Sequence, residues 1–240
     1  MKPEFIMDKS TLILYTYATF SRRRLLDEEK KHLAEATLAQ IANEVSVCQR
    51  CMLHHSRKLA VPGEGPVDAE IMFIGEGPGF HENEQGRPFV GAAGKYLEEL
   101  LAKINLRRED VFIGNVVKCR PPNNRDPLPE ELAACSDYLE RQIQVINPKV
   151  VVTLGRFSMA RFLPNAKISD VHGQAYRIKG RLIVPMFHPA AALHQPSLKT
   201  AVERDFIHLP ELIAKVDDSA PVEEPKPPED KSEPTQLSLF

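Results

Sequence analysis

A short apolar run that ends in glycine-rich turns constrains this chain more than any other feature. Residues 71–74 read Ile-Met-Phe-Ile without a polar break, the pattern of a β-strand buried on both faces. The run ends in Gly75-Glu-Gly-Pro-Gly79, and a second turn, Gly86-Arg-Pro-Phe-Val-Gly91, precedes a helix predicted to start near Ala92. Glycine lets backbone N–H groups approach a ligand closely. Because open α/β sheets bind ligands beyond their strand carboxyl ends, this stretch is predicted to form the floor of an active site.

The first glycine loop alone also fits an ordinary strand-to-helix turn. Its Gly-x-Gly-x-Gly spacing does not match the dinucleotide fingerprint GxGxxG, and the chain has no glycine-rich phosphate loop ending in Gly-Lys-Ser or Gly-Lys-Thr. The functional interpretation therefore depends on the other motifs.

Strand and helix patterns alternate along the chain. Further buried strands are predicted at 111–117, 149–155 and 181–185, with a hairpin-like partner at 175–178, and helices at 26–47, 94–104, 129–147, 156–162 and 201–216. This order indicates an α/β fold: a three-layer sandwich with a central, mostly parallel four-stranded sheet and helices on both faces. The loops at 75–79, 115–120, 155–156 and 187–190 all follow strand carboxyl ends and are expected to converge.

Length and charge suggest one domain with two tails. Residues 1–25 are predicted to be a poorly ordered extension, residues 26–216 the domain, and residues 217–240 a disordered, acidic, proline-rich tail. That tail has seven acidic residues against two lysines, a net −5, so the rest of the chain carries +3 of the total −2. A mildly basic body is compatible with a nucleic-acid ligand. No apolar run reaches membrane-spanning length and no signal-peptide pattern is present, so a cytoplasmic protein is expected.

The four cysteines suggest a metal site. Cys48 and Cys51 form a C-x2-C pair, and Cys119 and Cys135 follow later in the chain. Free cysteine also packs well as a small hydrophobic residue, so four unrelated buried thiols are the alternative. Disulfides are unusual in a cytoplasmic protein. The set favours a four-thiolate site for zinc or iron–sulfur, and the spacing does not decide between them.

Four motifs occur in order over roughly residues 48–210: Gly75–Gly79, Gly86–Gly91, Gly114-Asn115 with Cys119-Arg-Pro-Pro122, and His188-Pro-Ala-Ala-Ala-Leu193. Together with the cysteine positions they resemble family 4 uracil-DNA glycosylases. The resemblance implies a structural [4Fe–4S] cluster held by Cys48, Cys51, Cys119 and Cys135. It also implies an enzyme that flips deoxyuridine out of DNA, hydrolyses the N-glycosidic bond, releases uracil and leaves an abasic site.

The resemblance assigns roles in reading the base. Phe89 is expected to stack on the flipped ring, as the corresponding Phe of the family does. Asn115 has the donor and acceptor that fit uracil N3–H and O4 and misfit cytosine, although without the family a strand-end turn residue would be the preferred interpretation. His188 is expected to donate a hydrogen bond to uracil O2 as negative charge develops there.

Roles around the sugar are expected for the first glycine loop. Glu76 and the backbone amides of Gly77 and Gly79 are expected to lie next to the sugar and the attacking water. Gly75 and Gly77 are expected to line the site of the base. Other glycosylase families place an Asp in this loop, and residues 75–79 contain none. The water-activating residue is therefore open between Glu76, His81 and Glu82.

DNA contacts are expected outside the pocket. Leu193 is the candidate wedge that fills the gap left by the flipped base. Basic residues that are candidates for phosphate contacts, with solvated surface charges as the alternative, are Lys118, Arg120, Arg125, Lys199 and Arg204.

The chain closes with Gln-Leu-Ser-Leu-Phe, which resembles the bacterial sliding-clamp binding peptide. Its anchors are Gln236, Leu237, Leu239 and Phe240. The alternative is an apolar end without a function, because short motifs often match by chance.

Three functions remain to be compared. The leading one is a monomeric, nucleoid-associated glycosylase acting on uracil-containing DNA, with no membrane partner. The second is a protein of the same fold that binds uracil-DNA without turnover. Relatives that trap the base covalently carry a basic insertion before the third cysteine, whereas residues 115–119 run straight through without one. The third is a catalytically idle module docked on the replication clamp, which the presence of Asn115, Phe89 and His188 disfavours.

Overall fold

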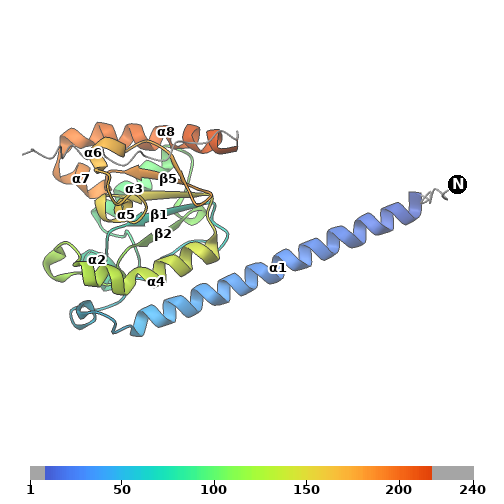
Figure 1. The fold of residues 1–240 in the computed structure, drawn as a ribbon, viewed down its shortest axis with the longest axis horizontal. Helices are drawn as coiled ribbons and strands as arrows, with labels where there is room; N and C mark the ends of the chain where they lie inside the picture. The colour runs from blue at the N-terminus through green and yellow to red at the C-terminus, as the bar shows by residue number, and fades with distance from the viewer. Residues whose placement is uncertain (1–8, 218–240) are drawn as a thin grey trace, which may run out of the picture.

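A five-stranded, mostly parallel sheet forms the centre of the computed structural model, which describes the backbone of residues 9–217 and the side chains of residues 27–214 (Figure 1). The strands lie in the order β2-β1-β3-β5-β4. Their bounds are β1 Ile71–Gly75, β2 Phe112–Asn115, β3 Val150–Leu154, β4 Tyr176–Ile178 and β5 Arg181–Met186. All neighbours pair in parallel except β4, which pairs antiparallel with β5. The predicted four-stranded parallel sheet is confirmed, with the hairpin partner β4 added as a fifth strand at its edge.

Helices connect the strands and cover both faces. Their bounds are α1 Lys9–Val47, α2 Phe80–Gln85, α3 Ala92–Ala102, α4 Pro129–Ile146, α5 Arg156–Ala160, α6 Ile168–Val171, α7 Pro189–His194 and α8 Lys199–Asp217. Four single turns of 3-10 helix lie between them: η1 Met52–His55, η2 Arg108–Asp110, η3 Pro122–Asn124 and η4 Pro196–Leu198. Figure 1 shows α8 and α4 on opposite sides of the sheet.

Alternation along the strands produces two cores, because successive side chains of a strand point to opposite faces. Phe73 and Val152 belong to the core under α3, α7 and α8, whereas Met72 and Val151 belong to the core under α4, α5 and α6. Continuous apolar strands are therefore buried on both sides, as the sequence predicts. The three-layer sandwich is confirmed.

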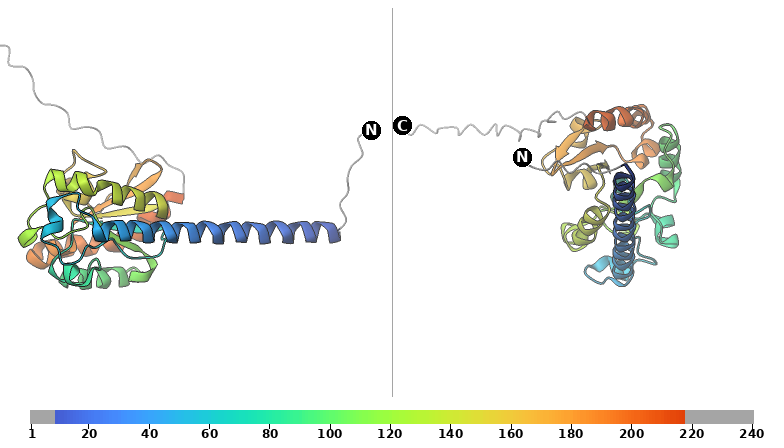
Figure 2. Two further views of the ribbon diagram at one scale, coloured as in Figure 1. Left: turned by 90° about the horizontal axis from the view of Figure 1, so that it is seen from below. Right: turned by 90° about the vertical axis from the view of Figure 1, so that its right-hand side faces the viewer.

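Helix α1 begins at Lys9, well before the predicted start at Leu26. The chain has no proline and no glycine between Pro3 and Pro62, so nothing in the sequence stops the helix in that direction. Figures 1 and 2 show its N-terminal part extending away from the body, while its C-terminal part lies against α4. The predicted poorly ordered extension thus takes helical form from residue 9, and residues 1–8 lie outside the described part.

Residues 218–240, which contain nearly all of the predicted acidic tail and the whole clamp-like peptide, also lie outside the described residues. Across residues 9–217, no helix combines the length and apolar character that crossing a membrane requires.

The strand order places a functional crevice. The chain leaves β1 to one side for β2 and then returns to its other side for β3, so the direction of the strand order reverses at β1. Ligands of open α/β sheets bind at such a reversal, beyond the carboxyl ends of the strands. Gly75, Asn115, Gly155 and His188 all lie at or just past those ends.

Candidate active site

Gly75 and Asn115 occupy the same level of the sheet, where β1 and β2 end side by side. They are register partners of the parallel pair. A Cβ on Gly75 would lie 2.5 Å from Asn115 Oδ1 and 2.7 Å from Phe89 Cζ. Side chains of 115 and 89 therefore meet over residue 75, and only glycine leaves room for them. The convergence of the glycine loops with the end of β2 is confirmed.

Asn115 has an acceptor that no group in the structure uses. The residue is 2% exposed, and its Oδ1 has no hydrogen-bond partner among the described residues. Its main-chain carbonyl, in contrast, accepts a bond of 3.0 Å from Lys118 Nζ. A buried unpaired side-chain oxygen is uncommon in folded proteins, because leaving it without a partner costs about 1–3 kcal/mol. This feature distinguishes Asn115 from an ordinary turn residue and points to a ligand that supplies a donor.

Phe89 and His188 bring two rings to the same place from different loops. Their ring centroids are 5.5 Å apart with an interplanar angle of 22°. His188 follows β5, and a Cβ on Gly155, after β3, would lie 3.3 Å from His188 Cβ. The predicted meeting of the loops after β3 and β5 is therefore confirmed.

The hydrogen bonding of His188 fixes its tautomer. The Nδ1 atom accepts a bond of 3.1 Å from the backbone N–H of Ala190, at the start of α7. A neutral imidazole whose Nδ1 is an acceptor carries its proton on Nε2. Burial lowers the pKa of His188 to about 4, although the negative charge of Glu82 opposes this shift. The ring is thus a neutral Nε2–H donor at physiological pH.

Glu82 joins the two glycine loops. Its Oε2 accepts from the backbone N–H of Gly79 at 3.1 Å, and its Oε1 accepts from Val90 and Gly91 at 2.8 Å each. Both carboxylate oxygens therefore accept hydrogen bonds from main-chain amides, so this side chain holds the two loops together. Of the three candidates for water activation, Glu82 is the one that this geometry disfavours.

The other two candidates differ in their surroundings. Glu76 is partly buried, and its pKa is raised by burial and by the negative charge of Asp126, against the opposing effect of Arg156. A partly desolvated carboxylate with a raised pKa in a crevice is a frequent form of general base. His81 is exposed, and its ring lies edge-on to that of Phe80. Glu76 is the more suitable base.

The four cysteines come together around one cavity. All four are free thiols, and they line one cavity with Arg57, Lys118 and Tyr138. N–H groups point at three of the sulfurs: Arg50 N at Cys48 (3.5 Å), Arg57 Nη1 at Cys119 (3.1 Å) and Lys118 N at Cys135 (3.3 Å). Within residues 27–214, no group of His, Cys, Asp and Glu side chains has the arrangement of a site for a single metal ion.

Lys118 links that cavity to the pocket, and it is not a phosphate contact. It is 1% exposed, and its Nζ donates to the carbonyl of Asn115 and, at 2.6 Å, to Gln142 Oε1. Burial lowers its pKa to about 8. The prediction that Lys118 contacts DNA is wrong, because its ammonium group is buried and forms hydrogen bonds inside the protein.

The remaining DNA-contact candidates lie at the surface. Leu193 on α7 is 47% exposed, which an apolar wedge requires. Arg125 forms a bidentate pair with the buried Glu131, and Arg120 donates to Asn124 while its guanidinium lies over the ring of Phe80. Lys199 is exposed, and Arg204 donates to Asp205. Their contacts with phosphate stay predictions.

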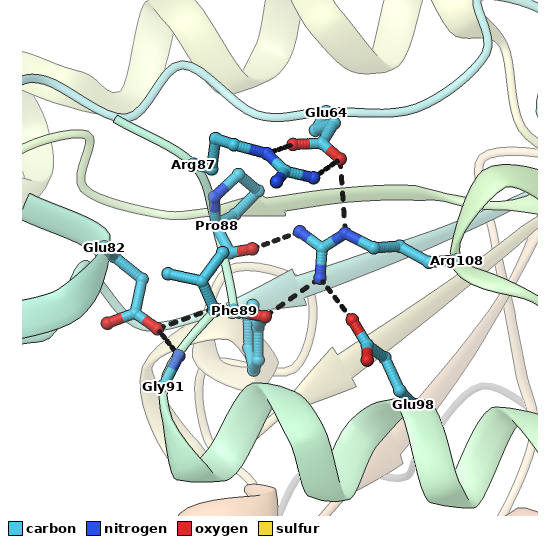
Figure 3. A network of polar contacts seen from close by, with 9 residues as sticks. Glu64, Glu82, Arg87, Pro88, Phe89, Gly91, Glu98 and Arg108 are labelled. Carbon is cyan, nitrogen blue, oxygen red and sulfur yellow. Dashed lines mark hydrogen bonds and ion pairs between the residues drawn. The ribbon is translucent and has the colours of Figure 1, made fainter. Parts of the chain in front are cut away.

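The sequence does not predict that Glu82 and Arg108 hold the glycine loops in place. The spacing of Gly79 and Glu82 is that of a helix N-terminus followed by an acid three residues later, a signal that was available. Arg108 is different: it stands in the charged run Arg-Arg-Glu-Asp, and nothing in that run separates it from Arg107. Yet Arg108 donates to the carbonyls of Pro88 and Phe89, as Figure 3 shows.

An aromatic ring, an unpaired amide oxygen and an imidazole thus lie close together beyond the strand ends of an α/β sheet. The profile of the Uracil DNA glycosylase superfamily matches residues 62–208. The chain is 49% identical over 189 residues to the Type-4 uracil-DNA glycosylase of Archaeoglobus fulgidus, covering 75% of this chain and 94% of that protein. It is 51% identical over 184 residues to the Type-4 uracil-DNA glycosylase of Saccharolobus solfataricus, covering 72% of this chain and 85% of that protein.

A Type-5 uracil-DNA glycosylase, from Thermus thermophilus, is 33% identical over 149 residues, covering 53% of this chain and 68% of that protein. The chain therefore belongs to the uracil-DNA glycosylase superfamily, and within it to the type-4 (family 4) enzymes. The predicted family is confirmed.

The pKa of His188 predicts an unusual pH profile. Because kcat/KM reports the pKa values of the free enzyme, His188 should cause no fall in uracil release near pH 6.5 and should cause one only as the pH approaches about 4, where it gains a proton and Ala190 loses its acceptor. The Glu76 carboxyl, whose pKa burial raises, should cause a separate fall at higher pH than that of His188. The measurement is kcat/KM for a uracil-containing oligonucleotide between pH 4 and pH 8, in wild type and in His188→Asn, where only the fall near pH 4 should disappear. A fall centred near 6.5, the ordinary value for histidine, that disappears in His188→Asn would contradict the assignment.

Proposed function

We propose that the chain is a uracil-DNA glycosylase that flips deoxyuridine out of DNA and hydrolyses its N-glycosidic bond, as the first step of base excision repair. The observation that carries this proposal is the buried, unpaired Oδ1 of Asn115 beside the ring of Phe89. An aromatic platform binds any base, and the neighbouring amide then decides which base edge is accepted.

The amide of Asn115 distinguishes uracil from cytosine. Its Oδ1 accepts from uracil N3–H, and its Nδ2 donates to uracil O4. Cytosine has an acceptor at N3 and a donor at N4, so both contacts would place like groups against each other. In a site that excludes water, such unpaired groups reject the wrong base strongly. Gly75 supports this recognition because a side chain there would displace the amide.

His188 acts on the departing base. As the bond breaks, negative charge accumulates on uracil, chiefly at O2, and the sugar acquires oxocarbenium character. The Nε2–H of the neutral imidazole donates to O2, and the amide of Ala190 keeps the ring in that tautomer. Removing one such preorganised donor typically slows a reaction by about 10²–10³-fold.

Glu76 is placed to orient the attacking water. It follows Gly75 directly, at the end of the strand on which the base rests, and its carboxylate is partly desolvated. The amide of Gly77 faces the sugar in this proposal, whereas the amide of Gly79, expected from the sequence to do the same, already donates to Glu82. A Cβ on Gly77 would lie 2.7 Å from Val117 Cγ2, so the backbone of this loop packs directly on the chain after β2.

Uracil release from an oligonucleotide with one uracil opposite guanine tests this function. Wild type should produce an alkali-labile abasic site, and Asn115→Ala and His188→Ala should each lose about 10²-fold or more in single-turnover rate. Arg107→Met is a control away from the base pocket, because Arg107 is 69% exposed and pairs with Glu109 and Asp110, and it should retain the wild-type rate. Binding of the uracil oligonucleotide without any abasic product would instead support the alternative, a protein that captures uracil-DNA without turnover.

We further propose that Cys48, Cys51, Cys119 and Cys135 hold a [4Fe–4S] cluster. The support is a cavity lined by all four thiols, with N–H groups directed at three of the sulfurs, in a chain that belongs to the type-4 enzymes. Such a cluster takes one thiolate per iron and so suits thiols spread around a larger centre. When bound, it would cross-link the chain after α1, the segment that follows β2 and helix α4.

Metal analysis tests the cluster independently of activity. Protein purified without oxygen should contain about four irons and four sulfides per chain and absorb in the visible range, and Cys135→Ser should lose that absorbance. The neighbouring, half-buried Ser136 provides a control, because Ser136→Ala should keep it. One zinc per chain and no iron would overturn the proposal.

A contact with the bacterial sliding clamp is proposed for Gln236, Leu237, Leu239 and Phe240. The tethering segment raises the local concentration of the enzyme near replicating DNA in the cytoplasm, where the protein would act as a nucleoid-associated monomer. Replacing Leu239 and Phe240 with alanine should abolish binding to purified clamp, with Ser238→Ala as the matched control. Uracil release from a short oligonucleotide should not change. Equal clamp binding by both variants would contradict the proposal.

A further inference from the structure

The loop that carries Phe89 is held between two opposite charges (Figure 3). On one side, the Arg108 guanidinium donates to the carbonyl of Phe89, at 2.9 Å, and to that of Pro88. On the other side, the Glu82 carboxylate accepts from the amides of Val90 and Gly91. The positively charged guanidinium therefore donates hydrogen bonds to the carbonyls of this turn, and the negatively charged carboxylate accepts hydrogen bonds from the amides that follow.

The turn needs this support because its backbone is strained. Phe89 has φ of +52°, a left-handed conformation that bulky L residues avoid. Gly94, in the first turn of α3, has no side chain, and a Cβ there would overlap the carbonyl of Phe89. This conformation directs the Phe89 ring over Gly75 and toward His188. The position of the aromatic platform thus depends on keeping an unfavourable backbone conformation.

Arg108 is itself fixed by acids on two sides. Its Nε donates to Glu64 at 3.2 Å and its Nη1 lies 3.4 Å from Glu98. Glu64 also receives a bidentate pair from Arg87, with both bonds at 2.7 Å. The backbone of Glu64 bridges Ile113 of β2 through bonds of 2.7 and 2.9 Å, which anchors the network on the sheet. Arg108 is 14% exposed, and its planar fork suits two neighbouring carbonyls.

We infer that Arg108 is a positioning residue for base recognition, which presets the ring of Phe89 for stacking on the flipped uracil. This inference rests on the proposed function. Arg108 acts through the main chain of Pro88 and Phe89, so it should influence binding of the base and leave binding of the DNA backbone unchanged. Its neighbour Arg107 pairs with Glu109 and Asp110 at the surface and is 69% exposed, so it has no such role.

The matched pair Arg108→Met and Arg107→Met tests the inference. Aromatic–base stacking is worth enough that a misplaced ring should lower kcat/KM for a uracil oligonucleotide about tenfold in Arg108→Met, while Arg107→Met stays within about twofold of wild type. The dissociation constant for an oligonucleotide with an abasic site, which has no base to stack, should be the same in all three proteins. If wild type does not release uracil, the proposed function itself is refuted. This outcome is distinct from a lack of difference between the two variants.

A double-mutant cycle with Phe89→Ala separates positioning from general stability. If Arg108 acts through the ring, Arg108→Met should change kcat/KM less than about twofold in the Phe89→Ala background. Arg108→Lys keeps the charge beside Glu64 but loses the fork, so it should show an intermediate loss and carries the same cycle if Arg108→Met does not fold. Equal activity of the Arg107 and Arg108 variants, or losses from Arg108 and Phe89 that multiply in full, would overturn the inference.

Discussion

The pairing of Gly75 with Asn115 is the constraint on which the rest of the site depends. Parallel strands β1 and β2 end at the same level, and the missing side chain at 75 gives the amide of Asn115 and the ring of Phe89 a common space. A methyl group at that position would displace both. The sheet therefore does more than support loops, because its register places Gly75 beside Asn115 and so leaves room for the ring of Phe89 there.

Around this register, charged groups fix backbone segments that have no regular secondary structure. Glu82 ties the two glycine loops, Arg108 ties the Phe89 turn to the edge of the sheet, and buried Lys118 ties the carbonyl of Asn115 to helix α4 through Gln142. Each of these side chains gives backbone groups a fixed hydrogen-bond partner in place of water before any ligand binds. Such contacts are the usual physical basis of a preorganised site. Lys118 also donates its amide to Cys135, so the thiol cavity and the pocket share one residue.

The sequence predicts local features well here and long-range ones poorly. Apolar strands, the glycine turns and the positions of Asn115, Phe89 and His188 follow from short motifs, and the sheet order then brings them together. The edge strand β4 pairs with β5 across a two-residue turn, so this hairpin is also a local feature that the sequence predicts. The contact of Arg108 with residues 88 and 89 spans about twenty positions and leaves no local pattern, and α1 extends to Lys9 because no residue in its sequence ends it.

We propose above that the unpaired Oδ1 of Asn115 recognises uracil, and the other roles in the site depend on this one. A crystal structure of the protein with abasic-site DNA and free uracil tests this most directly. We expect uracil to lie on the ring of Phe89, with its N3–H donating to Asn115 Oδ1 and its O2 accepting from His188 Nε2. Uracil bound away from Phe89, or bound with Asn115 Oδ1 still without a donor, would contradict it.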